Sequence, residues 1–258
     1  MTSGVPAGWV APGAPAPPLP PPGAPGAGGV IRRERVTLPS QDRLLAGTVV
    51  SAPVPSGAGV LFVHGLGSSR MTNVERAEAV AQAHAATCLA LDLGGHGEST
   101  GSLSRMTPRG NLADAVAGFD LLAGLAGVDR DRIGVCAASY GAYLSVLLSA
   151  LRPVSRLLLR APALYADDSF DRPLGQRLRG DAGTAPTLLA HVALFSGRLL
   201  VVESERDEVI GADTIAAYLA AARPGVAHVV QAGAAHALTD PVWRSQFQQV
   251  VVEFLAGL

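Results

Sequence analysis

The sequence contains no lysine, so all 20 residues counted as Lys plus Arg are arginines. This absence excludes chemistry that depends on a lysine amine, such as Schiff-base formation or phosphate binding by a P-loop lysine. Cysteine is also scarce, and the two residues Cys88 and Cys136 are too few for a disulfide framework. The 20 basic residues are balanced by 21 acidic ones, so the chain lacks the basic surface expected of a nucleic-acid-binding protein.

Long hydrophobic runs are missing as well. No apolar stretch approaches the ~18 residues that a membrane-spanning helix needs, and the first residues lack the basic start and apolar region of a signal peptide. The six histidines show none of the H-E-x-x-H or H-x-x-x-H spacings typical of metal sites. We therefore expect a cytoplasmic protein that needs no metal or other cofactor.

Residues 1–30 differ in composition from the rest of the chain. Nine of the 19 prolines lie here, separated by alanine and glycine, and the first charged residue is Arg32. Proline removes hydrogen-bond donors and glycine adds chain entropy, so this segment is predicted to be a disordered tail, partly polyproline II. Its P-P-L-P-P-P stretch is of the kind that docks in an aromatic groove of a partner. Residues 31–258 are predicted to form one domain.

In that domain, short apolar runs alternate with amphipathic segments. Strands are predicted at 35–38, 44–51, 59–63, 87–93, 132–137, 156–160, 199–202 and 227–230. Helices are predicted from a Thr72–Glu75 capping box, from Thr107-Pro108, over 140–151 and 213–222, and from Asp240-Pro241. The first two strands form a predicted hairpin. The later strands alternate with helices, which requires an α/β fold with a mostly parallel sheet covered on both faces.

One junction of a predicted strand and helix carries a serine, within the segment A-A-S-Y-G (137–141). Such a turn is sharp and strained, and it holds the serine hydroxyl clear of the sheet. The positions two residues before and after Ser139 must be small for the turn to close, and they are Ala137 and Gly141. Ser139 is therefore the candidate nucleophile, and the alternative is a serine buried in a turn.

A serine hydroxyl needs a base to remove its proton. In folds that place a serine on this kind of strand-to-helix turn, the acid and then the histidine follow the serine along the chain. The downstream histidines are His191, in an Ala- and Leu-rich segment, His228, within a predicted strand, and His236. His236 lies between the last predicted strand and helix, at the sheet edge where open α/β folds bind ligands. It is the candidate base, and its alternative is a surface loop histidine.

The acid is expected in the loop after the predicted strand 199–202. Four carboxylates compete there: Glu203, Glu205, Asp207 and Glu208. Asp207 is favoured because the loop must leave the strand before it turns toward the histidine, and because a short side chain suits holding an imidazole. The three glutamates remain alternatives, as does a solvated acidic turn without a catalytic role.

Attack on a carbonyl carbon creates an oxyanion that needs hydrogen-bond donors. One candidate donor is the backbone N–H of Tyr140, directly after the nucleophile. The other is the N–H of Leu66 in the H-G-L-G-S-S loop, where Gly65 and Gly67 permit a close backbone approach. His64 is expected to orient this loop through its ring.

Several motifs together resemble the α/β-hydrolase superfamily, from about residue 35 to the end. They are H-G-L-G (64–67), D-L-G-G-H-G-E-S (92–99), A-A-S-Y-G (137–141), R-D-E-V (206–209) and His236. The chain is similar to the compact serine esterases and peptidase-like hydrolases of that superfamily. The resemblance implies an α/β-hydrolase fold, with a mostly parallel sheet of about eight strands and helices on both faces.

Two positions depart from the superfamily pattern, since Ala137 replaces the usual glycine and Gly94 stands where arginine is common. Neither departure removes a catalytic group. Residues 161–196 lie where this superfamily inserts lids, and their shortness predicts a small cap over an open pocket. The expected activity is hydrolysis of small-molecule carboxylic esters through an acyl-enzyme. An aminopeptidase or amidase, or a non-catalytic binding protein on the same scaffold, is the alternative.

Overall fold

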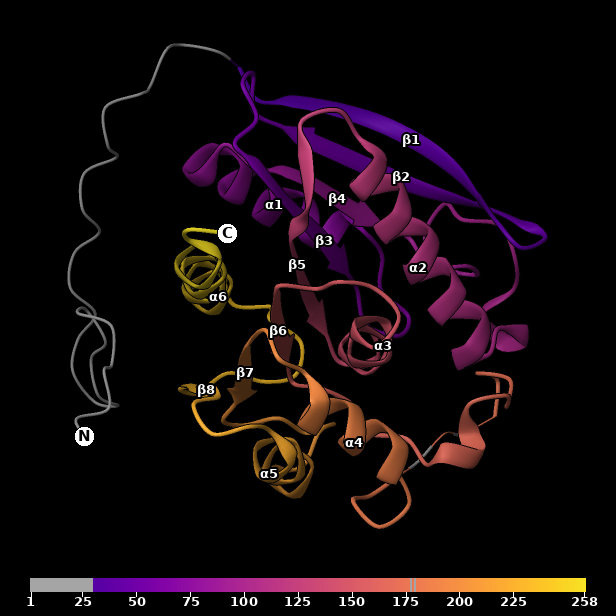
Figure 1. Cartoon of the computed structure of the whole chain (residues 1–258). Coiled ribbons are helices and arrows are strands. Elements are labelled where there is room, and N and C mark those ends of the chain that lie inside the picture. The colour runs from indigo at the N-terminus through magenta and orange to yellow at the C-terminus, as the bar shows by residue number, and fades with distance from the viewer. Residues whose placement is uncertain (1–29, 177, 179) are drawn as a thin grey trace.

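The computed structural model describes residues 30–176, 178 and 180–258. Of the predicted tail, only Val30 falls within this range, and it is exposed. The described part contains eight strands and six α-helices (Figure 1). The strands are β1 (Arg32–Ser40), β2 (Arg43–Ser51), β3 (Gly57–Val63), β4 (Thr87–Leu91), β5 (Val128–Ala138), β6 (Arg156–Arg160), β7 (Arg198–Ser204) and β8 (Ala227–Gln231). The helices are α1 (Met71–His84), α2 (Pro108–Gly124), α3 (Tyr140–Ser149), α4 (Pro186–Leu194), α5 (Ala212–Ala221) and α6 (Pro241–Leu255).

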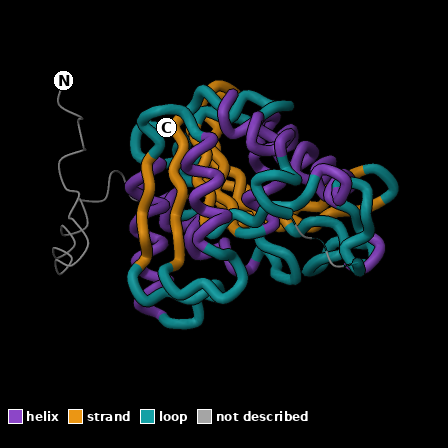
Figure 2. Tube along the Cα trace, turned by 90° about the horizontal axis from the view of Figure 1, so that it is seen from below, coloured by secondary structure: helices purple, strands orange, loops and turns teal. Residues whose placement is uncertain are grey.

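All eight strands form one sheet in the order β1-β2-β4-β3-β5-β6-β7-β8. β2 pairs antiparallel with both β1 and β4, and every later pairing is parallel. Figure 2 shows neighbouring strands running side by side, with helices around them. The predicted α/β-hydrolase fold is confirmed. The loops after β3, β5, β7 and β8 meet at one edge of the sheet, because parallel strands end on the same side.

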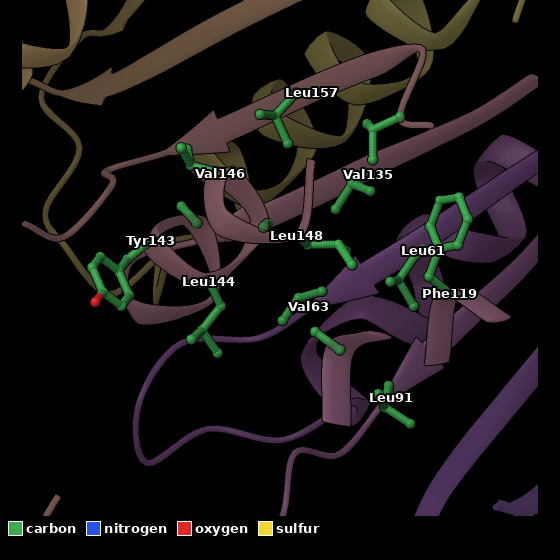
Figure 3. Close-up of a cluster of buried hydrophobic side chains, with 14 of the residues drawn as sticks. Leu61, Val63, Leu91, Phe119, Val135, Tyr143, Leu144, Val146, Leu148 and Leu157 are labelled. Atoms are coloured by element: carbon green, nitrogen blue, oxygen red, sulfur yellow. The ribbon is translucent and has the colours of Figure 1, made fainter. Parts of the chain in front are cut away.

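Helices cover both faces of the sheet. In β3, Leu61 and Val63 face the side covered by α2, α3, α4 and α5, whereas Val60 and Phe62 face α1 and α6. Figure 3 shows the first of these layers, where Phe119 of α2 lies beside Leu61. Strands buried on both faces are apolar throughout instead of alternating, which explains the continuous run G-V-L-F-V at positions 59–63.

The two helix starts predicted from a capping residue followed by proline are confirmed, and α3 begins at Tyr140 as predicted. The side chain of Thr107 accepts a hydrogen bond from the N–H of Gly110 at 3.1 Å, with Pro108 in the first turn of α2. Asp240 caps α6 in the same way, accepting from the N–H of Val242 at 2.7 Å. Both caps satisfy amides that have no partner within the helix.

The predicted capping box of α1 is wrong. The helix begins at Met71, and its N-cap residue Arg70 makes no side-chain cap bond. Instead, the N–H of Arg70 donates to Asp92 Oδ1 at 2.5 Å, and the Arg70 guanidinium forms a buried ion pair with the same carboxylate. A carboxylate from the loop after β4 thus stabilises the positive end of the helix, the role expected of Thr72 and Glu75.

Other details of the fold also bear on the sequence predictions. The predicted strand 87–93 ends at Leu91, because the N–H of Leu93 donates to His64 Nε2 instead of continuing the ladder. Cys88 and Cys136 are free, buried thiols on β4 and β5, with β3 between them. Over the described ranges, no helix is both long and apolar enough to cross a membrane.

Candidate active site

Ser139 occupies the turn between β5 and α3 in a strained backbone conformation. Its φ is +52° and its ψ is −118°, a combination that non-glycine residues rarely adopt. The turn is tight, because a Cβ on Gly141 would lie 2.4 Å from the carbonyl oxygen of His64. Ala137 on the other side of the turn is buried, so the space there accommodates a methyl group. The small residues around the serine therefore have the steric role that the sequence predicts.

His236 and Asp207 lie side by side in the loops after β8 and β7. His236 Nδ1 lies 3.0 Å from Asp207 Oδ1 and 2.9 Å from Oδ2. Asp207 Oδ1 also accepts hydrogen bonds from the N–H groups of Val209, at 2.9 Å, and Ile210, at 2.7 Å. Burial disfavours the charged carboxylate, but the bonds from His236 and these amides outweigh burial and lower the pKa of Asp207. The carboxylate can hold the imidazole proton on Nδ1, which leaves Nε2 free to act as a base.

The three glutamates considered as alternative acids have other partners. Glu203 contacts His228 Nε2 at 2.9 Å. Glu205 accepts a hydrogen bond from the N–H of Gly233 at 2.6 Å, and Glu208 accepts one from the backbone N–H of His236 at 3.1 Å. Glu203 lies within β7, which continues to Ser204, and the other three carboxylates follow in the loop. Among the four, the hydrogen bonds of the described residues bring only Asp207 to the ring of His236. His228 lies on β8, and His191 lies on α4 beside a separate cavity.

The loop after β3 lies directly against Ser139. A Cβ on Gly65 would lie 3.3 Å from Ser139 Cβ. His64 holds the loop in place, since its Nδ1 bonds the carbonyl oxygen of Gly65 at 2.8 Å and its Nε2 accepts the N–H of Leu93 at 3.1 Å. Burial lowers the pKa of His64 to about 4, so the ring is neutral at physiological pH. The predicted structural role of His64 is confirmed.

Both predicted oxyanion donors adjoin this arrangement. Tyr140 is the first residue of α3, so its N–H has no acceptor one turn back. The N–H of Leu66 has no acceptor within the described part of the chain. The side chain of Tyr140 has a different task, because it is buried and donates to Asn111 Oδ1 at 3.0 Å.

Ser139, His236 and Leu66 line one cleft of about 530 Å³. Asp207 lies behind the histidine, with its side chain 5% exposed against 20% for His236. Within the described residues, no hydrogen bond joins Ser139 Oγ to the imidazole. Such pairs in unliganded enzymes are commonly long and tighten when substrate binds. The arrangement brings a hydroxyl, an imidazole and a carboxylate together at one cleft.

Arg160 is a further site residue, and no sequence motif marks it. It ends β6 and is 5% exposed. Its Nη2 donates to the carbonyl oxygens of Ala235, at 3.1 Å, and His236, at 2.7 Å. Its own carbonyl oxygen accepts the N–H of Ser139 at 2.9 Å. One buried arginine therefore joins the serine turn to the histidine loop.

The departure at Gly94 has a structural explanation. A Cβ at this position would lie 2.8 Å from Arg43 Nε. Arg43 comes from β2, and its Nη2 pairs with the buried carboxylate of Asp114 at 3.2 Å. An arginine from β2 thus fills the space beside Gly94, which lies in the loop after β4.

A family model described as the alpha/beta hydrolase family matches residues 60–255. The chain belongs to the alpha/beta hydrolase family. Membership in this family supports a hydrolase activity. A comparison with curated proteins finds no match.

Solved structures of other alpha/beta proteins share the fold at low sequence identity. An esterase from Pyrococcus furiosus is 21% identical, with a TM-score of 0.69 over 87% of this chain and 90% of that chain. The protein Est1E from Butyrivibrio proteoclasticus, solved with ferulic acid, is 16% identical, with a TM-score of 0.69 over 85% of this chain and 97% of that one. A thioesterase domain from the curacin biosynthetic pathway is 12% identical, with a TM-score of 0.66 over 86% of this chain and 99% of that one.

Proposed function

We propose that this alpha/beta hydrolase cleaves small-molecule carboxylic esters through an acyl-enzyme on Ser139. The observation that carries the proposal is the Asp207–His236 pair, whose imidazole lines the same cleft as the hydroxyl of Ser139. The family match and the shared fold of the Pyrococcus furiosus esterase support the same reaction class.

In the proposed mechanism, Ser139 Oγ attacks the ester carbonyl while His236 Nε2 takes its proton. The tetrahedral intermediate collapses when the C–O bond to the alcohol breaks, and the imidazolium returns that proton to the leaving oxygen. Water then attacks the acyl-enzyme with His236 again as base, which releases the carboxylic acid and restores the serine. Asp207 stabilises the imidazolium at each step, because its carboxylate is already ionised and directed at Nδ1.

The N–H groups of Leu66 and Tyr140 are proposed as the oxyanion donors. A negative charge on the former carbonyl oxygen is stabilised most by donors that need no reorientation. The amide of Tyr140 also lies at the N-terminus of α3, where the helix dipole favours negative charge. The loop carrying Leu66 is held rigid by the two hydrogen bonds of His64.

The test is fluorophosphonate labelling together with turnover of p-nitrophenyl butyrate. We expect Ser139→Ala to abolish both while leaving the melting temperature within a few degrees of wild type. Ser149→Ala, at the end of the same helix, is the matched control and should retain labelling and turnover. Labelling that survives in Ser139→Ala would remove Ser139 from the mechanism.

Ester and amide cleavage use the same catalytic groups, so substrate comparison must separate them. We expect kcat/KM for p-nitrophenyl butyrate to exceed that for aminoacyl p-nitroanilides. The reverse order would assign an aminopeptidase or amidase activity to the same residues. A protein that is neither labelled nor active on either class would be a binding protein on a hydrolase scaffold.

A further inference from the structure

Three arginines line the cleft that contains Ser139. Arg76 comes from α1, Arg160 from the end of β6, and Arg244 from α6. Arg76 and Arg160 pack on the same aromatic ring, since their guanidinium carbons lie 5.0 and 5.7 Å from the centre of Phe247. Elements distant in sequence therefore bring positive charge to the cleft that contains Ser139.

In the part of the chain that the structure describes, these guanidinium groups are not in direct contact with a carboxylate. Within the described residues, none of the three arginines forms an ion pair. Asp207 and Glu208 bond to His236, so they attract Arg160 through their charge without forming an ion pair with it. Glu75 is an exposed residue at the rim of the cleft. Gathering like charges without an opposite charge is unfavourable at low dielectric.

The cost of burying positive charge is seen at Arg160, which is buried, and at Arg76, which is partly buried. Burial lowers the pKa of Arg160 to about 10 and also lowers the pKa of Arg76. The negative charges of Asp207 and Glu208 partly offset this shift at Arg160, and that of Glu75 does so at Arg76. Repulsion between Arg160 and Arg76, and between Arg76 and Arg244, adds to the shift. A bound anion would relieve this repulsion for all three groups.

Several N–H groups of these arginines have no acceptor in the described part of the chain. The Nε atoms of Arg76 and Arg160 are buried and have no hydrogen-bond partner. Arg76 Nη1 bonds Thr72 and Asn73, and Arg160 Nη2 bonds the histidine loop. The other terminal nitrogen of each guanidinium has no acceptor in the described part of the chain. Two forked donors in one cleft match the geometry of a carboxylate.

We propose that Arg76, Arg160 and Arg244 form an anion-binding subsite, and that the preferred substrate is an ester carrying a carboxylate group. This inference rests on the proposed esterase function for its turnover but not for its binding. The carboxylate belongs to either the acyl part or the alcohol part of the ester, and matched substrates distinguish these two positions.

Binding is measured first, in Ser139→Ala protein that cannot turn over an ester. The probes are monomethyl glutarate, which carries one carboxylate, and the neutral dimethyl glutarate. Titration calorimetry measures the dissociation constant of each. We expect the monoanion to bind at least about tenfold more tightly than the neutral ester, as a charged hydrogen-bonded contact allows. Adding Arg76→Gln should remove that preference, whereas Arg130→Gln, on the exposed start of β5, should preserve it.

Turnover then locates the carboxylate. One substrate pair is the p-nitrophenyl monoester of glutaric acid and its methyl ester, with the charge in the acyl part. The other is 4-acetoxybenzoate and its methyl ester, with the charge in the alcohol part. For the pair whose carboxylate reaches the subsite, we compare kcat/KM of the anionic substrate with kcat/KM of its neutral methyl ester. We expect this ratio to fall about tenfold in Arg76→Gln and in Arg244→Gln. High salt should lower the same ratio in the wild type, because the exposed Arg244 charge is screened.

The outcomes separate the two proposals. The subsite would be overturned if calorimetry showed no preference for the anion and if both substrate pairs gave the same ratio in the wild type, Arg76→Gln and Arg244→Gln. That result would leave the esterase proposal standing. An unlabelled and inactive wild type would overturn the esterase, and calorimetry alone would then decide the subsite. Stacking of the arginines on Phe247 for stability only would appear as a lower melting temperature in Arg76→Gln without any change in these ratios.

Discussion

The carbonyl oxygen of His236 accepts a hydrogen bond from Arg160 Nη2 at 2.7 Å, while the carbonyl oxygen of Arg160 itself accepts the N–H of Ser139. The backbone segments of the proposed nucleophile and base are thus bonded to one residue of β6. Because the serine turn and the histidine loop touch the same rigid strand, their relative position depends on this arginine.

We therefore predict that Arg160→Gln lowers kcat for a neutral ester by about 100-fold, the effect of a catalytic group displaced by about 1 Å. Fluorophosphonate labelling of Ser139 should slow in parallel, and Arg160→Lys should recover part of the rate. Arg156→Gln is the matched control, because Arg156 is another buried arginine of β6 that bonds backbone carbonyls, those of Phe254 and Ala256. Equal rate losses in both variants would assign Arg160 to stability alone.

The alternation of strands and helices and the serine turn were predictable because both depend on local sequence. The turn at Ser139 requires small residues two positions before and after the serine, and the segment A-A-S-Y-G supplies them as Ala137 and Gly141. Arg160 was not predictable, because a lone arginine at a strand end has no periodic signal and its partners are 75 and 76 residues away. The error at Thr72 has the same origin, since Asp92, which replaces the capping box, lies 22 residues from Arg70.

The choice among the acidic residues at the end of β7 and in the loop after it also depends partly on local sequence and partly on distant contacts. Position along the loop favours Asp207, but sequence alone leaves Glu203, Glu205 and Glu208 as competitors. The loop conformation separates them, because each glutamate bonds a different group. Those contacts depend on where β8 and its following loop lie, which no local pattern in the E-S-E-R-D-E segment encodes.

Asp207→Asn should lower kcat by about 10⁴, because an amide neither holds the correct imidazole tautomer nor stabilises the imidazolium. The melting temperature should change little. The matched variants Glu203→Gln, Glu205→Gln and Glu208→Gln should each remain within about tenfold of wild type, since none of these side chains touches the imidazole. A nearly normal Asp207→Asn enzyme together with one inactive glutamine variant would transfer the acid role to that glutamate.

Gly141→Ala should destabilise the fold, because the added methyl would lie 2.4 Å from the carbonyl oxygen of His64 and 2.6 Å from that of Val63. Backbone atoms of β3 and its loop cannot move aside cheaply, so we expect a loss of about 3 kcal/mol in the free energy of unfolding. Gly124→Ala is the control: Gly124 ends α2, and a Cβ there meets nothing within 4 Å. Urea denaturation of both variants measures the difference, and equal stabilities would contradict the steric account of the turn.

His64 should make stability depend on pH. Burial lowers its pKa to about 4 in the folded protein, against 6.5 for an ordinary histidine. The unfolded chain therefore binds a proton more readily, so this contribution to stability is complete above pH 6.5 and declines as the pH falls toward 4. The expected loss between pH 7 and pH 5 is about 2 kcal/mol.

His64→Gln isolates that contribution, because an amide can bond the loop but does not titrate. At pH 7 the variant should be about 1–3 kcal/mol less stable than wild type, since the bonds to Gly65 and Leu93 are strained or lost. At pH 5 the gap should narrow by about 2 kcal/mol, because only the wild type is destabilised by protonation at this position. Other histidines are common to both proteins and cancel in the difference. Urea denaturation at the two pH values measures the gap, and a gap that stays constant would mean that His64 is protonated in the folded protein as readily as in the unfolded chain.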